Sequence, residues 1–87
     1  MRISWPFFFV QVRGESMWPE RIPGNRYLGT TLLSPKVGRT VLARAHTGGF
    51  VIKRVADKIG EEFLLKGTVS WATSFTVARG DILGVVF

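Results

Sequence analysis

The sequence predicts a small all-β domain, and three observations lead to this fold class. Short runs of β-branched and aromatic residues alternate with turn residues, and the 87 residues include ten glycines and four prolines. No long stretch repeats apolar residues at the helical spacing. Apolar residues make up 46% of the chain, which argues against disorder. We therefore expect one domain over residues 1–87, folded as a partly open β-barrel or β-ribbon.

The first half of the chain supplies three expected strands, each ended by a turn signal. Residues 5–12 read WPFFFVQV, and the turn-rich PERIPGNR follows later in the chain. A second strand is expected at residues 27–33, before the turn SPKVG. Residues 40–45 form the third, and the HTGG that follows is typical of a hairpin loop.

The second half is expected to complete the sheet. Residues 50–56 are the returning partner of the hairpin, and DKIGE then turns the chain into a strand at residues 62–66. The stretch GTVSWATSFTVARG is interpreted as looser. The last strand is expected at residues 82–87.

Composition excludes several kinds of site. The chain has no cysteine, so disulfides and thiolate metal sites are ruled out. His46 is the single histidine, so a site with several histidine ligands cannot form, and we expect neither a metal nor an organic cofactor. His46 lies in the predicted hairpin tip and is interpreted as an exposed turn residue. Catalysis must then depend on Ser, Lys, Arg, Asp or Glu.

The net charge of +6 favours anionic partners, although it also fits simple solubility. No run of five or more basic residues occurs, so a nucleic-acid surface is not favoured. A non-catalytic basic β-barrel that binds nucleic acid or extended peptides remains the alternative hypothesis for the whole chain.

The apolar start of the chain is interpreted as a strand. It is too short to span a bilayer, and Pro6 interrupts it. We therefore expect no transmembrane segment, and a location either in the cytoplasm or at a membrane, peripherally or through a partner. Trp5 and Phe7 to Phe9 leave a shallow contact with an anionic membrane surface open.

Two residues could carry chemistry, Ser16 in GESMWP and Lys53 in FVIKRVAD. Along a strand, Lys53 shares a face with Val51 and Val55, while Arg54 lies on the other face, so one of the two cations must meet apolar neighbours unless the strand is fully exposed. An apolar setting lowers the pKa of a lysine, and a neutral lysine can activate a serine hydroxyl. A serine in a turn and a solvated lysine at a sheet edge are the structural alternatives.

The order of motifs resembles the serine–lysine peptidases, a group that includes type I signal peptidase, the organelle inner-membrane peptidases and the self-cleaving SOS repressors. The segments VRGESMWPERIPGNRYL, PKVGRTVLAR, FVIKRV, FLLKG and GDILGVV follow one another over nearly the whole chain. The Ser-Met-x-Pro box followed by Ile-Lys-Arg-Val is the specific part. The resemblance implies the catalytic β fold of this superfamily and a short, unanchored member of its signal-peptidase-like branch.

The resemblance also implies roles for individual residues. Ser16 matches the nucleophile, Lys53 the general base, Met17 a residue beside the substrate groove, and Pro19 the proline that shapes the turn. The backbone N–H of Ser16 matches an oxyanion donor. The implied activity is a serine endopeptidase that removes a leader or propeptide from a partner protein, binding it in an extended conformation and cutting after small residues.

The chain departs from the family pattern at several positions. Gly14 brings no side-chain donor to the oxyanion hole. Asn25 and Arg39 replace the aspartates of two Gly-Asp turns, and the Gly-Asp-Asn and Asp-Ser-Arg features are lost from GTVSWATSFTVARG. Ser74 or Ser70 could take the place of the serine that contacts the lysine in the family. These departures indicate a divergent member and leave open a degenerate one that binds extended peptides without cutting them.

Overall fold

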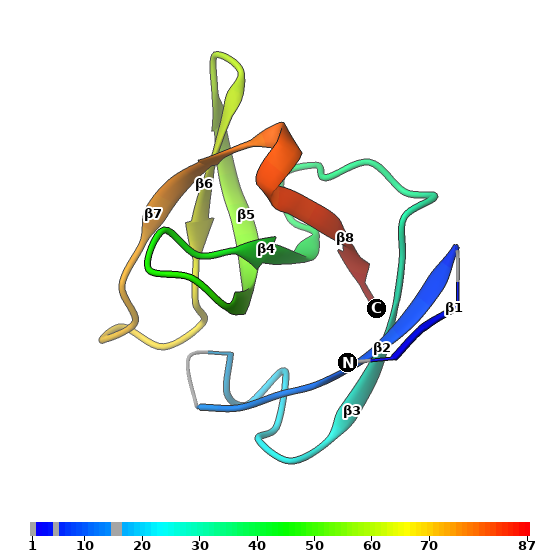
Figure 1. The fold of residues 1–87 in the computed structure, drawn as a ribbon. Helices are drawn as coiled ribbons and strands as arrows, with labels where there is room; N and C mark the ends of the chain where they lie inside the picture. The colour runs from blue at the N-terminus through cyan, green and yellow to red at the C-terminus, as the bar shows by residue number, and fades with distance from the viewer. Residues whose placement is uncertain (1, 5, 15–16) are drawn as a thin grey trace.

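The computed structural model describes residues 2–4, 6–14 and 17–87, and these form one antiparallel sheet in the order β1-β2-β3-β8-β4-β5-β6-β7. The predicted all-β class is confirmed. The sheet curls into a half-barrel in which β4 to β8 gather on one side and β1 to β3 lie on the other (Figure 1). Its strands are β1 (Arg2–Ser4), β2 (Phe7–Gln11), β3 (Arg26–Thr30), β4 (Thr40–Arg44), β5 (Phe50–Ile59), β6 (Glu62–Lys66), β7 (Phe75–Ala78) and β8 (Ile82–Val86).

Several elements differ from the sequence-based prediction. Strand β3 ends at Thr30, three residues before the expected end at residue 33. Strand β5 runs three residues beyond the expected end, to Ile59, and a register shift between Val55 and Asp57 keeps it paired with β6. The stretch predicted to be loose contains β7, whose pairing with β6 supplies the order that its sequence does not indicate. Strand β1 was not predicted and adds to the edge of the sheet beside β2. A short 3₁₀ turn, η1 (Arg79–Asp81), links β7 to β8.

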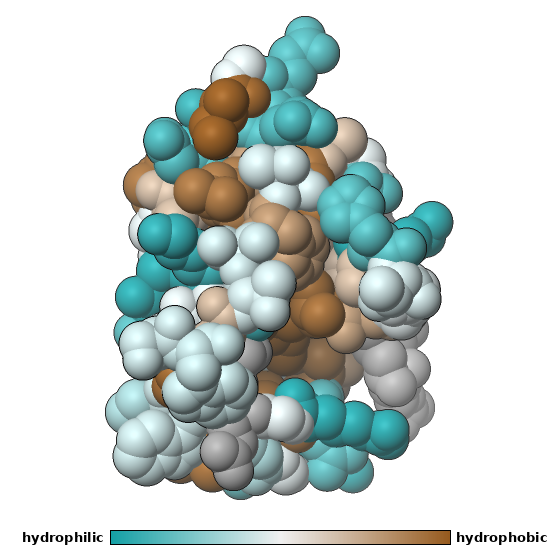
Figure 2. All heavy atoms as spheres, turned by 90° about the vertical axis from the view of Figure 1, so that its left-hand side faces the viewer, coloured by the Kyte–Doolittle hydropathy of each residue, from teal (hydrophilic) through white to brown (hydrophobic). Residues whose placement is uncertain are grey.

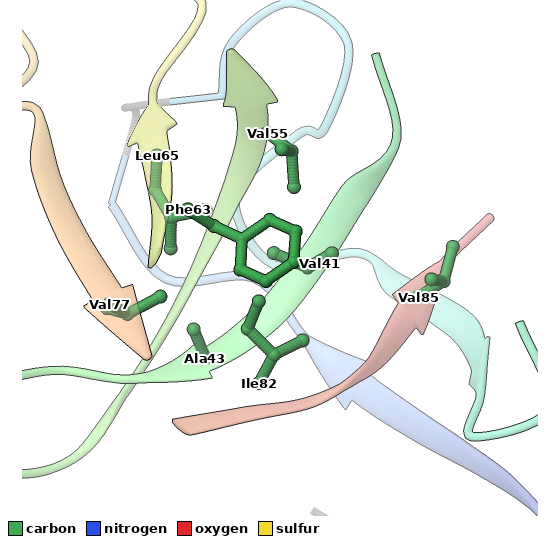
Figure 3. Packing of buried hydrophobic residues seen from close by; sticks show 8 residues of the cluster. All are labelled: Val41, Ala43, Val55, Phe63, Leu65, Val77, Ile82 and Val85. Carbon is green, nitrogen blue, oxygen red and sulfur yellow. The ribbon is translucent and has the colours of Figure 1, made fainter. Parts of the chain in front are cut away.

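The curled sheet encloses two apolar clusters, and β4 contributes to both. Val41 and Ala43 belong to the first cluster and Leu42 to the second, because alternate residues of a strand face opposite sides. Figure 3 shows the first cluster, in which Phe63 of β6 lies among side chains from β4, β5 and β8. Strands β4 and β5 are therefore buried on both faces around their middle residues.

The second cluster holds the β1–β3 half of the molecule against β8. Phe8 of β2 is buried, and its ring lies over Gly29 and Gly84 on neighbouring strands. A Cβ atom at Gly84 would lie 2.6 Å from the Phe8 ring and 2.7 Å from the carbonyl oxygen of Thr30. Only glycine fits at this crossing, since any side chain would displace either the ring or the backbone.

Candidate functional site

Lys53 is the buried cation of β5. Only 7% of its surface is exposed, and it pairs in register with Val41 of β4. Arg54 points to the other face, where its guanidinium forms an ion pair with Glu20 and stays partly exposed. The prediction that one of these two cations meets apolar neighbours is thus confirmed, and that cation is the lysine.

The surroundings of Lys53 disfavour its charged form. Burial lowers the pKa of the Lys53 amine below its ordinary value of 10.5, because desolvation penalises the ammonium ion. Within residues 2–4, 6–14 and 17–87, the ion pair present is that of Arg54 with Glu20, so Lys53 has no acidic partner there. A lysine in this state is more readily neutral than a solvated one and can accept a proton.

Met17 and Lys53 line the same cleft. This cleft has a volume of about 330 Å³, and its walls come from β2, β4, β5 and the loop between β2 and β3. Met17 is 1% exposed and packs in the second apolar cluster, beside Val12 and Leu42. The structure therefore brings the residue predicted for the substrate groove to the same concavity as the predicted base.

Backbone hydrogen bonds hold the loop that carries Met17. The Val12 N–H donates to Asn25 at 3.0 Å, and the Gly24 N–H donates to Val12 at 2.9 Å, which closes the base of the loop. Inside it, the Arg21 N–H donates to the Met17 carbonyl at 2.8 Å. Met17 is thereby fixed in position by its own backbone as well as by its packing.

Ser16 lies outside the described residues, and so does the backbone N–H predicted to donate in the oxyanion hole. Its described neighbour in the chain is Met17, in the wall of the cleft. Pro19 is exposed, follows a cis peptide bond and lies in the turn after Met17.

A second cavity lies beside Lys53, and we call it the aromatic cup. It has a volume of about 540 Å³ and lies between the β4–β5 hairpin loop and the residues that lead into β7. Figure 2 views this side of the molecule, where brown apolar surface lines a hollow between paler and teal side chains. Its lining includes Val51, Lys53, His46, Trp71, Thr73 and Phe75.

Ser70 and Ser74, predicted as candidates to orient the lysine, are both exposed. Neither lines the cleft or the aromatic cup, whereas the hydroxyl-bearing Thr73 lines the cup with Lys53. The same loop, residues 67–74, reaches the loop that carries Met17, because the Thr68 hydroxyl donates to the Trp18 carbonyl at 2.7 Å. The sequence carried no signal for Thr73 or Trp71, since this loop has no periodic pattern.

His46 is exposed, as predicted from its place in the hairpin loop, but it also makes contacts that the sequence did not suggest. Its Nε2 lies 2.8 Å from the Thr76 carbonyl, which makes this nitrogen the donor. Its ring meets Phe75 edge to face, with centroids 5.8 Å apart. These contacts join the hairpin loop to β7 across the cup.

Other classes of site find no support in the part of the chain that the structure describes. No group of three or more potential metal ligands occurs among these residues. None of their helices has the length and apolar character needed to cross a bilayer. Comparisons with protein-family models, curated proteins and solved structures find no match for this chain.

Proposed function

We propose that this protein is a serine–lysine peptidase in which Ser16 is the nucleophile and Lys53 the general base. The observation that carries the proposal is the burial of Lys53 with no acidic partner among the described residues. Met17 supports it further, because the residue next to Ser16 in the chain lines the same cleft as Lys53. A buried amine beside a serine is a known substitute for the histidine of a catalytic triad.

The proposed reaction is acyl transfer in two steps. Neutral Lys53 takes the proton of the Ser16 hydroxyl while Oγ attacks the peptide carbonyl carbon, and the resulting ammonium returns the proton to the leaving amine. The Ser16 backbone N–H donates to the oxyanion. In the second step, Lys53 takes a proton from water, the hydroxide attacks the ester, and the proton returns to Ser16 Oγ.

The proposed substrate is an extended leader or propeptide of a partner protein, cut after small residues. This part rests on the resemblance of the Ser-Met-x-Pro and Ile-Lys-Arg-Val motifs, together with the presence of an open cleft at Lys53. An extended chain suits a sheet protein, because peptide backbones readily bind along strands. The proposed mechanism uses the chain's own side chains and water.

A peripheral membrane contact is proposed for the outer face of β2. Phe7 and Phe9 are 42% and 53% exposed there, and Phe9 pairs in register with the exposed Leu28. Exposed apolar residues on a chain with net charge +6 favour anionic membrane surfaces. Co-sedimentation with vesicles containing phosphatidylserine should fall for Phe9→Ser, and equal sedimentation of the two proteins would end this proposal.

The decisive experiment compares three variants on a peptide that contains Ala-x-Ala. Ser16→Ala and Lys53→Met should each abolish cleavage, whereas Lys58→Met, which removes an exposed lysine from the same strand, should cleave normally. Circular dichroism would check that each variant is folded. Normal turnover by Ser16→Ala and Lys53→Met would refute the peptidase, and peptide binding without cleavage by the wild-type protein would identify a degenerate member.

A further inference from the structure

The aromatic cup has the form of a side-chain pocket. His46 holds one wall in place, because its Nε2 donates to Thr76 and its ring packs against Phe75. Trp71, from the loop before β7, presents an indole that is 66% exposed. An exposed indole on the wall of an apolar hollow leaves a large area to be covered by a ligand.

The cup is too large for the small side chains that the family resemblance implies. Its volume is about 540 Å³. A methyl group is about the size of one water molecule, whose share of the liquid is about 30 Å³. An alanine side chain would therefore leave the cup almost empty and would make few of its possible contacts, whereas an aromatic or branched aliphatic side chain would fill much more of it.

The position of the cup relative to the cleft indicates what kind of ligand enters it. Val51 and Lys53 line both cavities, so the cup and the cleft are neighbours that meet at the proposed general base. Successive side chains of an extended peptide point in opposite directions. One peptide crossing Lys53 can therefore place one side chain in the cleft and another in the cup.

We propose that the aromatic cup binds a phenylalanine or leucine side chain of an extended peptide, and so selects substrates with a large apolar residue near the cut bond. This inference rests on the proposed function, in that it assumes that a peptide substrate crosses Lys53. The small residue at the cut itself then lies beside Lys53, where the two cavities meet, and the cup adds a second requirement that excludes peptides with only small or acidic side chains.

The test measures binding separately from cleavage. The peptides are fluorescent, ten residues long and share a central Ala-x-Ala. Each peptide also carries one test residue, Phe, Leu, Ala or Asp, at one position outside the Ala-x-Ala. Each position on either side of the Ala-x-Ala is tested in turn. Binding to the Ser16→Ala variant is followed by fluorescence anisotropy. At one position, the Phe or Leu peptide should bind about ten-fold more tightly than the Ala peptide, as expected for filling an apolar pocket.

A variant of the cup wall and a matched control locate the effect. Trp71→Ala, made in the Ser16→Ala background, should abolish the ten-fold preference, because it removes the large exposed indole from the wall. Leu32→Ala removes a side chain with a similar exposure, 63%, that does not line the cup, and should leave the preference unchanged.

The results separate this inference from the proposed function. A Phe or Leu preference that depends on Trp71 would support the cup even if the wild-type protein cleaved nothing, in which case the peptidase alone would fail. If the peptides are cleaved but Phe and Leu are preferred at no position, the proposed role of the cup is refuted and the proposed peptidase activity is still supported. A preference for Phe or Leu that persists in the Trp71→Ala variant would also refute the proposed role of the cup.

Discussion

Replacing Lys53 with methionine should stabilise the protein at neutral pH. Methionine keeps the long, unbranched stem of lysine, so the apolar contacts of a side chain that is 7% exposed are largely retained. What is lost is a charged group that has no acidic partner among the described residues. Burying a polar group without full compensation costs about 1–3 kcal/mol in proteins, so Lys53→Met should raise the free energy of unfolding by roughly this amount.

The gain should depend on pH in a defined direction. Below the lowered pKa of Lys53, the amine is charged in both the folded and the unfolded protein. The full cost of burying the charged amine then lowers the free energy of unfolding of the wild type. Between that pKa and 10.5, the unfolded state binds more protons than the folded state, so the stability of the wild type rises with pH. The difference between the variant and the wild type should therefore shrink as the pH approaches 10.5.

Urea denaturation followed by tryptophan fluorescence measures this difference, at several pH values from 7 to 10.5. Other titrating groups are common to both proteins and largely cancel in the comparison. Lys58→Met, at an exposed position of the same strand, is the control and should change stability by less than about 0.5 kcal/mol. A Lys53→Met protein that is less stable than the wild type at pH 7, or a difference that does not vary with pH, would refute this reasoning.

Three further predictions test the core, the loop and the chemistry. Gly84→Ala should lower the free energy of unfolding by about 1–3 kcal/mol or more in urea denaturation, because the new Cβ would lie 2.7 Å from the Thr30 carbonyl oxygen. The control is Gly80→Ala, whose new Cβ would have no atom within 4 Å and which should not lower the free energy of unfolding in this way. Glu20→Gln should lower the free energy of unfolding by less than about 1 kcal/mol at pH 7, since the Glu20 and Arg54 side chains of the ion pair are both 39% exposed. A larger loss of stability would contradict the structure. If Lys53 is the base, kcat/KM should rise with pH to a midpoint below 10.5, and a midpoint at or above this value would exclude it.

Much of the sheet could be predicted from the sequence because local pattern and tertiary structure agree there. Strand β6 has the predicted bounds, Glu62–Lys66, and its buried and exposed residues alternate. The hairpin of β4 and β5 was indicated by its glycine-rich loop. Strand β7 could not be predicted, because its four residues follow a polar stretch and owe their conformation to pairing with β6.

The candidate site was predictable only in part. The alternation of side chains along β5 shows that Lys53 and Arg54 face opposite sides of the strand, but it does not show which side is less exposed to solvent. That choice is made by Glu20, which lies 34 positions away in sequence and gives Arg54 an anionic partner on its face. The face of Lys53 is instead shared with Val41, its register partner on β4, and both β4 and β5 contribute buried apolar residues to the first cluster. The aromatic cup likewise depends on loops that meet only in the folded chain.

The placement of Lys53 opposes what stability alone would favour. A methionine or leucine at this position would fill the same space without the desolvation of an amine, and buried groups that weaken a fold are concentrated at functional sites. If Lys53→Met is more stable and loses peptide cleavage, the same desolvation that weakens the fold also supplies the base. If the variant is more stable and cleaves normally, the buried amine has no part in the chemistry, and the cleft must act through other groups.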